Sequence, residues 1–337
     1  MRSWAFFLLA SALGAVFFAA VLALNSDYLF YAGYVVLQYI VLATAWNILG
    51  GYCGYVNFGS AAFFALGAYS SVTLHKLGGN VDRYASGVLA DALHVLLPMP
   101  IPALMLVGGL VSGIIGLGMG YLTLRLRGVF FAIATLAMAV VLQTLMINWD
   151  FVGGSRGAYV IRQDRIGAGL VSLSYIEYLF LLMLVLAVLA LTVARLIERS
   201  RLGFGFATIR DDEMAAEAAG VPTLRLKLVA TTISGAFMGM AGAPLPYYLG
   251  YIEPSATFGL PYAVNSIAMP MIGGTTTWAG PLIGAVLLGS LQQIATVTIS
   301  SAVNLLIVGV LLVVFVIIAP KGIVGLLLAW QHGRDKP

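Results

Sequence analysis

Ionisable side chains are sparse in this 337-residue chain, and their densest group is acidic: four of the 13 Asp and Glu residues lie between positions 211 and 217. Carboxylates act as general acids, bases or metal ligands when suitable partner groups converge on them. The three His residues, His75, His94 and His332, are scattered along the chain, and a single Cys53 excludes an intrachain disulfide. The sequence contains no P-loop, Ser-His-Asp or zinc-protease pattern. We therefore predict no catalytic residue, no metal site and no cofactor bound by this chain.

The acidic group is predicted to belong to a short helix within the segment 195–227. Thr208, followed three residues later by Asp211, is a capping-box-like start, and acidic residues favour the first turn of a helix. An alanine-rich run follows, and Gly220 is typical of a helix end. A helix over about 209–219 is too short to be stable alone in water, so it must dock on something. Two docking surfaces stay open. One is the chain's own helices, and the other is a partner subunit that delivers mechanical work.

The overall composition indicates the class of protein to which this segment belongs. The chain is 61% apolar and 9% charged, with a mean hydropathy of +1.01 and a net charge of +4, whereas soluble proteins are roughly 25% charged. So few charges cannot cover a water-soluble surface. The composition thus excludes a soluble enzyme, a nucleic-acid binder and a disordered tail. It predicts an all-α polytopic membrane protein with a single transmembrane domain over 1–337.

Stretches without charge predict about ten transmembrane helices, because a span needs about 20 apolar residues and a charge at mid-bilayer is costly. The stretches are 3–26, 28–75 with two spans, 92–124, 128–149, 178–194, 228–252, and 254–320 with three.

Lys and Arg residues set the predicted orientation. With the N-terminus inside and ten crossings, 12 of them fall on the cytoplasmic side and five outside, which favours cytoplasmic placement of both termini. The first apolar run, Trp4–Leu24, could alternatively be a signal peptide. Its length of about 21 residues exceeds the usual signal core and favours a retained helix.

The polar residues predicted within the spans are neutral. Carriers driven by protons or sodium commonly place ionisable residues there, so any driving force for uphill movement is expected to come from outside the spans. We expect most of these amides to join neighbouring helices. They are Gln38, Asn47, Asn57, Gln143, Asn148, Asn265, Gln292, Gln293 and Asn304.

Glycine residues are expected to shape the membrane domain in two ways. Gly50–Tyr55 and Gly273–Pro281 interrupt long apolar stretches. Such irregular backbone either borders a substrate path or forms a short turn at the membrane interface, and both alternatives stay open. Pairs with small-xxx-small spacing, such as Gly109 with Gly113 and Gly235 with Gly239, predict close helix contacts.

Several stretches resemble one family in the same order along the chain. The run Arg210–Gly220 resembles the EAA-type coupling segment of ABC-importer permeases, and in particular that of the LivM-type permeases of branched-chain amino acid transporters. Gly54–Tyr69, Arg127–Ala137, Gly153–Gly157 and Gly273–Gly284 also resemble this family, so that the matches run from about residue 37 to residue 325.

The resemblance implies a type II-like importer permease in the bacterial inner membrane, not an enzyme itself. It implies a second, LivH-like permease, two ATPase subunits that hold ATP and Mg²⁺, and an extracytoplasmic substrate-binding protein. Branched-chain amino acids are the expected cargo. Urea, short amides or aromatic acids are alternatives within the family, and a stand-alone secondary carrier or channel is an alternative outside it.

The resemblance also implies two groups of functional residues. The coupling group comprises Thr208, Arg210, Asp211, Asp212, Glu213, Glu217 and Gly220. The group expected along the substrate path comprises Asn57, Ser60, Phe63, Thr135, Gly273 and Gly274.

Overall fold

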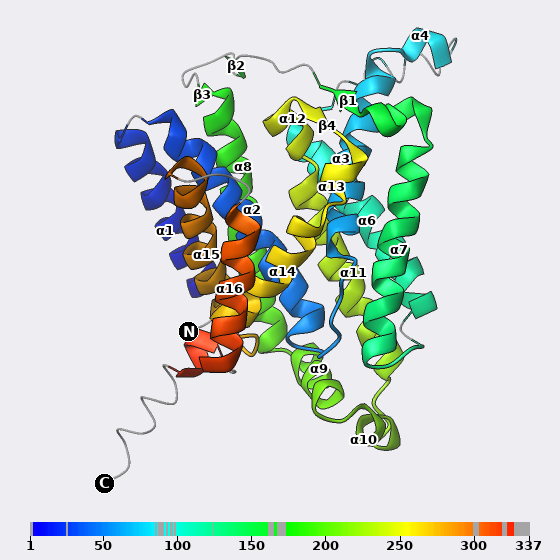
Figure 1. Cartoon of the computed structure of the whole chain (residues 1–337), viewed down its shortest axis with the longest axis vertical. Helices are drawn as coiled ribbons and strands as arrows, with labels where there is room; N and C mark the ends of the chain where they lie inside the picture. The colour runs from blue at the N-terminus through cyan, green and yellow to red at the C-terminus, as the bar shows by residue number, and fades with distance from the viewer. Residues whose placement is uncertain are drawn as a thin grey trace.

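A computed structural model describes residues 3–24, 26–84, 86, 91, 94, 97, 99–123, 125–160, 165–166, 173–298, 303–318 and 322–326. Within them the chain is almost entirely helical (Figure 1). The longer helices are α1 (Ser3–Ala23), α2 (Asp27–Gly50), α3 (Ser60–Gly78), α6 (Ile101–Thr123), α7 (Val129–Ile147), α8 (Tyr175–Glu198), α9 (Arg201–Asp211), α11 (Thr223–Gly242), α14 (Leu260–Gly273), α15 (Ala279–Thr298) and α16 (Val303–Ile318).

Short elements complete the described chain. The short helices are α4 (Val81–Tyr84), α10 (Glu213–Ala218), α12 (Leu245–Leu249) and α13 (Pro254–Thr257), with 3-10 turns η1 (Asp150–Val152) and η2 (Gly154–Arg156). The strands have two residues each: β1 (Ala158–Tyr159) pairs antiparallel with β4 (Tyr251–Ile252), and β2 (Arg165–Ile166) with β3 (Leu173–Ser174). The prediction of an all-helical fold is therefore confirmed for the part of the chain described.

Helix α2 lies at the centre of the helical body. It packs against α8, α11, α14 and α15, and every residue from 40 to 49 is buried. A helix that is apolar all round must be enclosed by other helices. By contrast, α1 packs against α8 at the periphery and keeps most of its surface exposed.

Helices α6 and α11 make an extensive and close contact through small residues. A methyl group added at Gly239 would lie 2.4 Å from the backbone oxygen of Gly108, and one at Gly109 would lie 2.6 Å from the Met240 side chain. Only a glycine permits such an approach. The close helix contacts predicted from the glycine spacing are therefore confirmed at Gly109 and Gly239.

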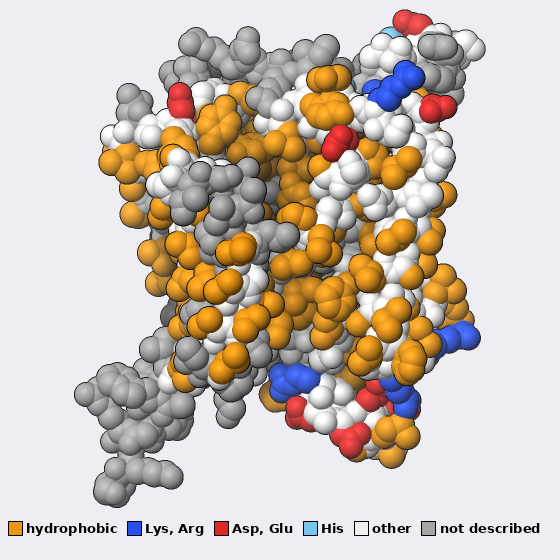
Figure 2. All heavy atoms as spheres, viewed as in Figure 1, with side chains coloured by type: hydrophobic (Ala, Val, Ile, Leu, Met, Phe, Trp, Pro, Cys, Tyr) orange, Lys and Arg blue, Asp and Glu red, His pale blue; other side chains and the backbone are white. Residues whose placement is uncertain are grey.

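Seven of the described helical segments are long and apolar enough to cross a membrane. They are Ala5–Ala23, Asp27–Gly50, Ile101–Thr123, Val129–Ile147, Tyr175–Glu198, Thr223–Leu249 and Ala279–Thr298. Figure 2 shows apolar side chains covering the middle of the body, with charged side chains gathered toward its two ends. The protein is therefore a multi-pass helical membrane protein.

The two ends of the body carry different elements. Helices α9 and α10 lie at one end, here called the loop end, while α4 and the β1–β4 pair lie at the other (Figure 1). At the loop end, the Arg195 guanidinium near the end of α8 lies 4.0 Å above the Phe6 ring of α1. The start of α1 is thus held beside the end of α8.

Candidate functional site

The helices α9 and α10 are separated by a break at Asp212. Asp212 has extended backbone, with φ −159° and ψ 107°, and its carboxylate accepts a 3.0 Å hydrogen bond from the Ala215 N–H at the start of α10. Ser200 caps α9 in the same way, through the N–H groups of Leu202 and Gly203. Two short helices with their own caps therefore occupy this segment.

This arrangement corrects the single helix predicted over 209–219. Thr208 does not begin a helix: it lies within α9, where its hydroxyl donates to the Gly205 carbonyl at 2.8 Å. Ser200 and Asp212 hold the cap positions instead, and both have extended backbone. Gly220 follows α10 with a φ of +83°, which glycine adopts without strain.

Glu213, the first residue of α10, enters a buried cluster. Its carboxylate lies 2.6 Å from the ammonium of Lys227 on α11 and accepts a hydrogen bond from the Tyr55 hydroxyl. Lys227 also donates to the Tyr55 hydroxyl at 3.1 Å. The Lys227 and Glu213 side chains are only 3% and 12% exposed. A charge removed from water to this extent needs a close opposite charge, and each of these two supplies it for the other.

The sequence predicts Lys227 at the end of the loop segment 195–227, and the structure places it in a helix. It belongs to α11 and to a segment, Thr223–Leu249, that is apolar enough to cross a membrane. One sequence signal for this position was present, because Lys227 directly precedes the charge-free run 228–252.

A second ion pair, more exposed to water, lies beside this cluster. Arg127 Nη2 lies 2.8 Å from Glu217 Oε2, and its Nε lies 3.7 Å from Glu213. The Thr223 hydroxyl donates to the other Glu217 oxygen at 2.8 Å. The Thr223 hydrogen bond, with Arg127 beside it, lowers the pKa of Glu217 below its ordinary value. Arg127, Thr223 and Tyr55 were missed as partners of the acidic group, because they lie far from it in sequence or across a helix break.

The remaining residues of the predicted coupling group lie on the exposed side. Asp211 is 73% exposed and lies 3.4 Å from the guanidinium of Arg210. Arg210 itself packs under Gly54, where a methyl group would lie 3.0 Å from its side chain. Gly54 has a φ of +79°, so both its conformation and its close contact with α9 require glycine.

The segment 51–59, between α2 and α3, has no regular secondary structure and leads away from α9 into the helical body (Figure 1). Trp46 donates from its indole nitrogen to the Asn57 carbonyl at 2.8 Å, and the Asn57 side chain accepts from the Gly59 N–H at 2.7 Å. The Thr135 hydroxyl of α7 accepts from the Phe58 N–H at 3.2 Å. Side chains thus supply hydrogen-bond partners for backbone groups of this segment that have none in a helix.

The residues predicted along the substrate path fall into two groups. Asn57, Ser60 and Thr135 come together at the start of α3, where the Ser60 hydroxyl lies 2.7 Å from that of Ser266 on α14. Phe63, one turn further along α3, packs its ring against Gly116 and Gly235.

Gly273 and Gly274 form the second group, at the end of α14. A methyl group added at Gly273 would clash with the Gly280 carbonyl oxygen, and methyl groups added at Gly280 or Gly322 would clash with the backbone of Gly274. Their segment also touches the first interruption, because a methyl group at Gly51 would lie 2.7 Å from the Thr275 carbonyl oxygen. The two glycine-rich interruptions are therefore neighbours in the structure.

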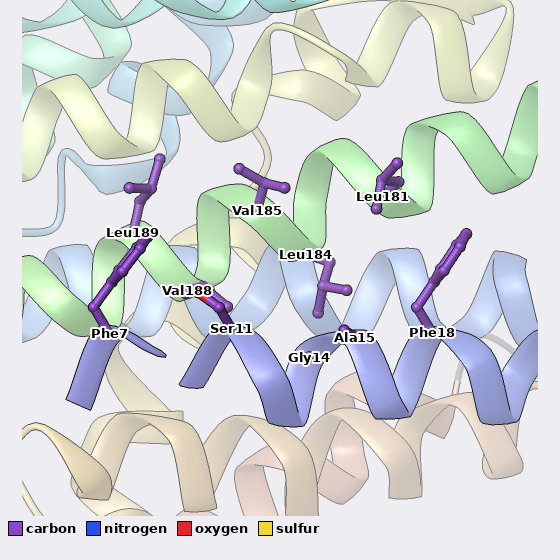
Figure 3. A pocket seen from close by; sticks show the side chains of 10 residues that line it. All are labelled: Phe7, Ser11, Gly14, Ala15, Phe18, Leu181, Leu184, Val185, Val188 and Leu189. Atoms are coloured by element: carbon purple, nitrogen blue, oxygen red, sulfur yellow. The ribbon is translucent and has the colours of Figure 1, made fainter. Parts of the chain in front are cut away.

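An apolar cavity of about 350 Å³ lies between α1 and α8, away from these groups (Figure 3). It is lined by Phe7, Ser11, Gly14, Ala15, Phe18, Leu181, Leu184, Val185, Val188 and Leu189. It contains none of the residues predicted to be functional.

The apolar helical body, with a polar cluster where α3 begins and short helices at one charged end, has the architecture of a multi-pass membrane protein. A family model described as the permease component of branched-chain amino acid transport systems matches residues 28–316, and the chain belongs to this family. The LivM-type family expected from the sequence is thereby confirmed.

Three relatives illustrate the similarity. The chain is 28% identical over 307 residues to the LivM permease protein of the high-affinity branched-chain amino acid transport system of Salmonella typhimurium, covering 85% of this chain and 67% of the relative. The LivM protein of Escherichia coli gives the same figures. A probable branched-chain amino acid permease protein LivH of Methanocaldococcus jannaschii is 25% identical over 282 residues, 80% of this chain and 82% of its own. No solved structure matches the chain.

Proposed function

We propose that this chain is a transmembrane subunit of an ATP-driven importer and that α9 and α10 receive the movement of separate ATPase subunits. The observation that carries the proposal is the exposure of large apolar side chains at the charged loop end: Phe204 on α9 is 70% exposed and Met214 on α10 is 63% exposed. Apolar side chains in such a place are typical of a protein interface. The opposite side of α10 is held to the body through Glu213. The two helices can therefore contact both a partner and the permease's own spans.

The proposed topology has ten crossings, with both termini in the cytoplasm together with α9 and α10. The seven apolar segments account for seven crossings, and α3, α14 and α16 supply the other three. Two contacts support this orientation. Arg195 holds Phe6 of α1 at the loop end, and Gly322, beyond α16, packs on Gly274.

The proposed partners are a second, LivH-like permease, two ATPase subunits that bind ATP and Mg²⁺, and an extracytoplasmic substrate-binding protein. The complex would lie in the bacterial inner membrane, and this chain would carry out no hydrolysis itself. The relatives support this assembly because they are permease proteins of both the LivM and LivH kinds.

The proposed cargo is a branched-chain or related hydrophobic amino acid, in line with the names of the relatives. In the alternating-access cycle that we propose, movement of α10 opens the path beside Asn57, Ser60, Phe63 and Thr135. Gly273 and Gly274 would form its boundary at the loop end. Urea, short amides and aromatic acids are the alternative cargoes within the family.

The experiment is leucine uptake into proteoliposomes that contain the complete complex, with and without ATP. The proposal predicts uptake that requires ATP and persists when an uncoupler removes the proton gradient. Uptake that needs no ATPase subunit and collapses with the uncoupler would instead show a secondary carrier.

The variant Glu217→Arg extends this experiment to the loop end. It places two like charges where Glu217 and Arg127 now lie 2.8 Å apart, so it should lower the leucine transported per ATP hydrolysed while the chain still enters the membrane. Unchanged uptake by this variant would count against the role of α10.

A further inference from the structure

Helix α10 owes its position to polar contacts more than to apolar packing. It has six residues, of which Ala216 is the buried one. Helices of this length are unstable alone in water. Its side-chain bonds to residues outside the helix run mainly from Glu213 and Glu217, and the Met214 sulfur accepts one more from Arg127. The place of α10 under the body therefore depends strongly on these two carboxylates.

The two carboxylates differ in their surroundings. The Arg127 and Glu217 side chains are 48% and 43% exposed, so water and salt weaken their attraction. Glu213 and Lys227 are almost fully enclosed, and their 2.6 Å contact is shared with the Tyr55 hydroxyl. Breaking the inner contact would leave a buried charge without its partner, so this pair resists separation far more than the outer one.

Tyr55 connects the inner pair to the polar cluster at the start of α3. It lies two residues before Asn57, on the irregular segment 51–59. Its ring also packs edge-on against Phe131 of α7, with ring centres 5.0 Å apart. No helix ladder holds this segment. The Tyr55 N–H bonds to the Leu49 carbonyl of α2 at 3.1 Å, and side chains hold the stretch 57–59 that follows. Glu213 is therefore connected to the backbone of Asn57 through the Tyr55 hydroxyl and two peptide units.

We propose that Glu213, Lys227 and Tyr55 form a buried latch that passes the movement of α10 to the backbone beside Asn57. Lys227 and Tyr55 are then positioning residues of the transport cycle: neither contacts cargo, and both determine how much of the ATPase movement reaches the path. This inference rests on the proposed function, because it presupposes that α10 is moved by a partner.

The test uses the complete complex in proteoliposomes and measures the ratio of radiolabelled leucine transported to ATP hydrolysed. Lys227→Met keeps the length of the side chain and removes its charge, and Tyr55→Phe keeps the ring and removes only the hydroxyl. We expect Lys227→Met to lower the ratio about fivefold or more and to leave ATP hydrolysis running. Tyr55→Phe should lower the ratio in the same direction.

Arg225→Met is the matched control. Arg225 lies two residues from Lys227 on the same helix, but its side chain is exposed. Its loss should leave the ratio unchanged. The double variant Tyr55→Phe with Lys227→Met should be no worse than Lys227→Met alone, because residues that act as one unit are not additive.

Three results decide the matter. If Lys227→Met assembles and keeps the wild-type ratio, or if Arg225→Met lowers it equally, the latch is overturned. If Lys227→Met fails to assemble, Tyr55→Phe decides alone, and an unchanged ratio overturns the latch. If wild-type vesicles show no ATP-dependent leucine uptake, the proposed function fails instead, a result visible before any variant is compared.

Discussion

The carboxylate of Glu198, the last residue of α8, accepts a 2.7 Å hydrogen bond from the backbone N–H of Trp278. Trp278 directly precedes α15, and the Tyr52 hydroxyl lies 3.5 Å from the same carboxylate oxygen. One side chain thus connects the end of α8 with both glycine-rich interruptions. These contacts place Glu198 at a junction of three segments that lie far apart in the sequence.

Loss of the Glu198 carboxylate should loosen this junction. Glu198→Ala leaves the partly buried Trp278 N–H without its acceptor, which costs about 1–3 kcal/mol of folding free energy. We expect a lower unfolding temperature in detergent, measured by the change in Trp fluorescence. Glu198→Gln keeps one acceptor oxygen and should lie between the wild type and Glu198→Ala. Equal stability of all three proteins would contradict this role.

The contact between α3 and α11 should not tolerate a side chain at Gly67. A methyl group there would lie 1.9 Å from the Gly239 backbone oxygen, so Gly67→Ala must push two helices apart at a cost of about 1–3 kcal/mol or more. The loss of monodisperse protein on size-exclusion chromatography would show this. Gly118→Ala is the control, since no atom lies within 4 Å of a methyl group at that position. Similar behaviour of the two variants would refute the close packing.

The Thr135 hydroxyl should matter for transport through its bond to the Phe58 N–H. Thr135→Val keeps the shape of the side chain and removes the acceptor, while Thr135→Ser retains it. We expect leucine uptake to fall in the first variant and recover in the second. Thr144→Val, on the same helix, removes a hydroxyl that bonds to its own helix at Val140, and it should transport normally. Normal uptake by Thr135→Val would remove this residue from the site.

Acid should release the outer contact of α10. The pKa of Glu217 is lowered in the folded protein, first by the Thr223 hydrogen bond and also by Arg127. A lowered pKa means that ionised Glu217 stabilises the folded state above the ordinary value near 4.5, and that this contribution is lost as the pH falls through the lowered value.

Hydrogen exchange of residues 213–218, corrected for the intrinsic pH dependence, measures this release. Exchange should stay slow from neutral pH down to about 4.5 and quicken below it. Thr223→Val removes the largest cause of the lowered pKa, so the transition should move to higher pH. A transition at the same pH in both proteins would be inconsistent with the Thr223 bond.

Much of the fold follows from the sequence because its causes are local or compositional. Apolar stretches without charge predict membrane helices wherever they occur, and glycine spacing predicts close contacts such as that of Gly239 with Gly108. The expected role of neutral amides as interhelical bonds is confirmed for Gln292, which donates to Asn265 at 2.9 Å, and for Gln38, whose amide lies 3.4 Å from the Ala241 carbonyl.

The parts that could not be predicted depend on distant or competing contacts. Ser200, Thr208 and Asp212 all have side chains able to cap a helix, and local sequence does not decide among them. The buried position of Lys227 depends on Tyr55, 172 residues away in the chain. A pattern read along one segment cannot show such a pairing.

Site-directed cross-linking of Met214→Cys, in a chain whose buried Cys53 is replaced by Ala, tests the central claim most directly. With the assembled complex in membranes, the account predicts a cross-link from this exposed residue of α10 to an ATPase subunit. It predicts none to the ATPase from Tyr159→Cys, at the opposite end and 77% exposed. A complex that transports leucine but shows no cross-link to the ATPase from position 214, or shows one from position 159, would contradict the account.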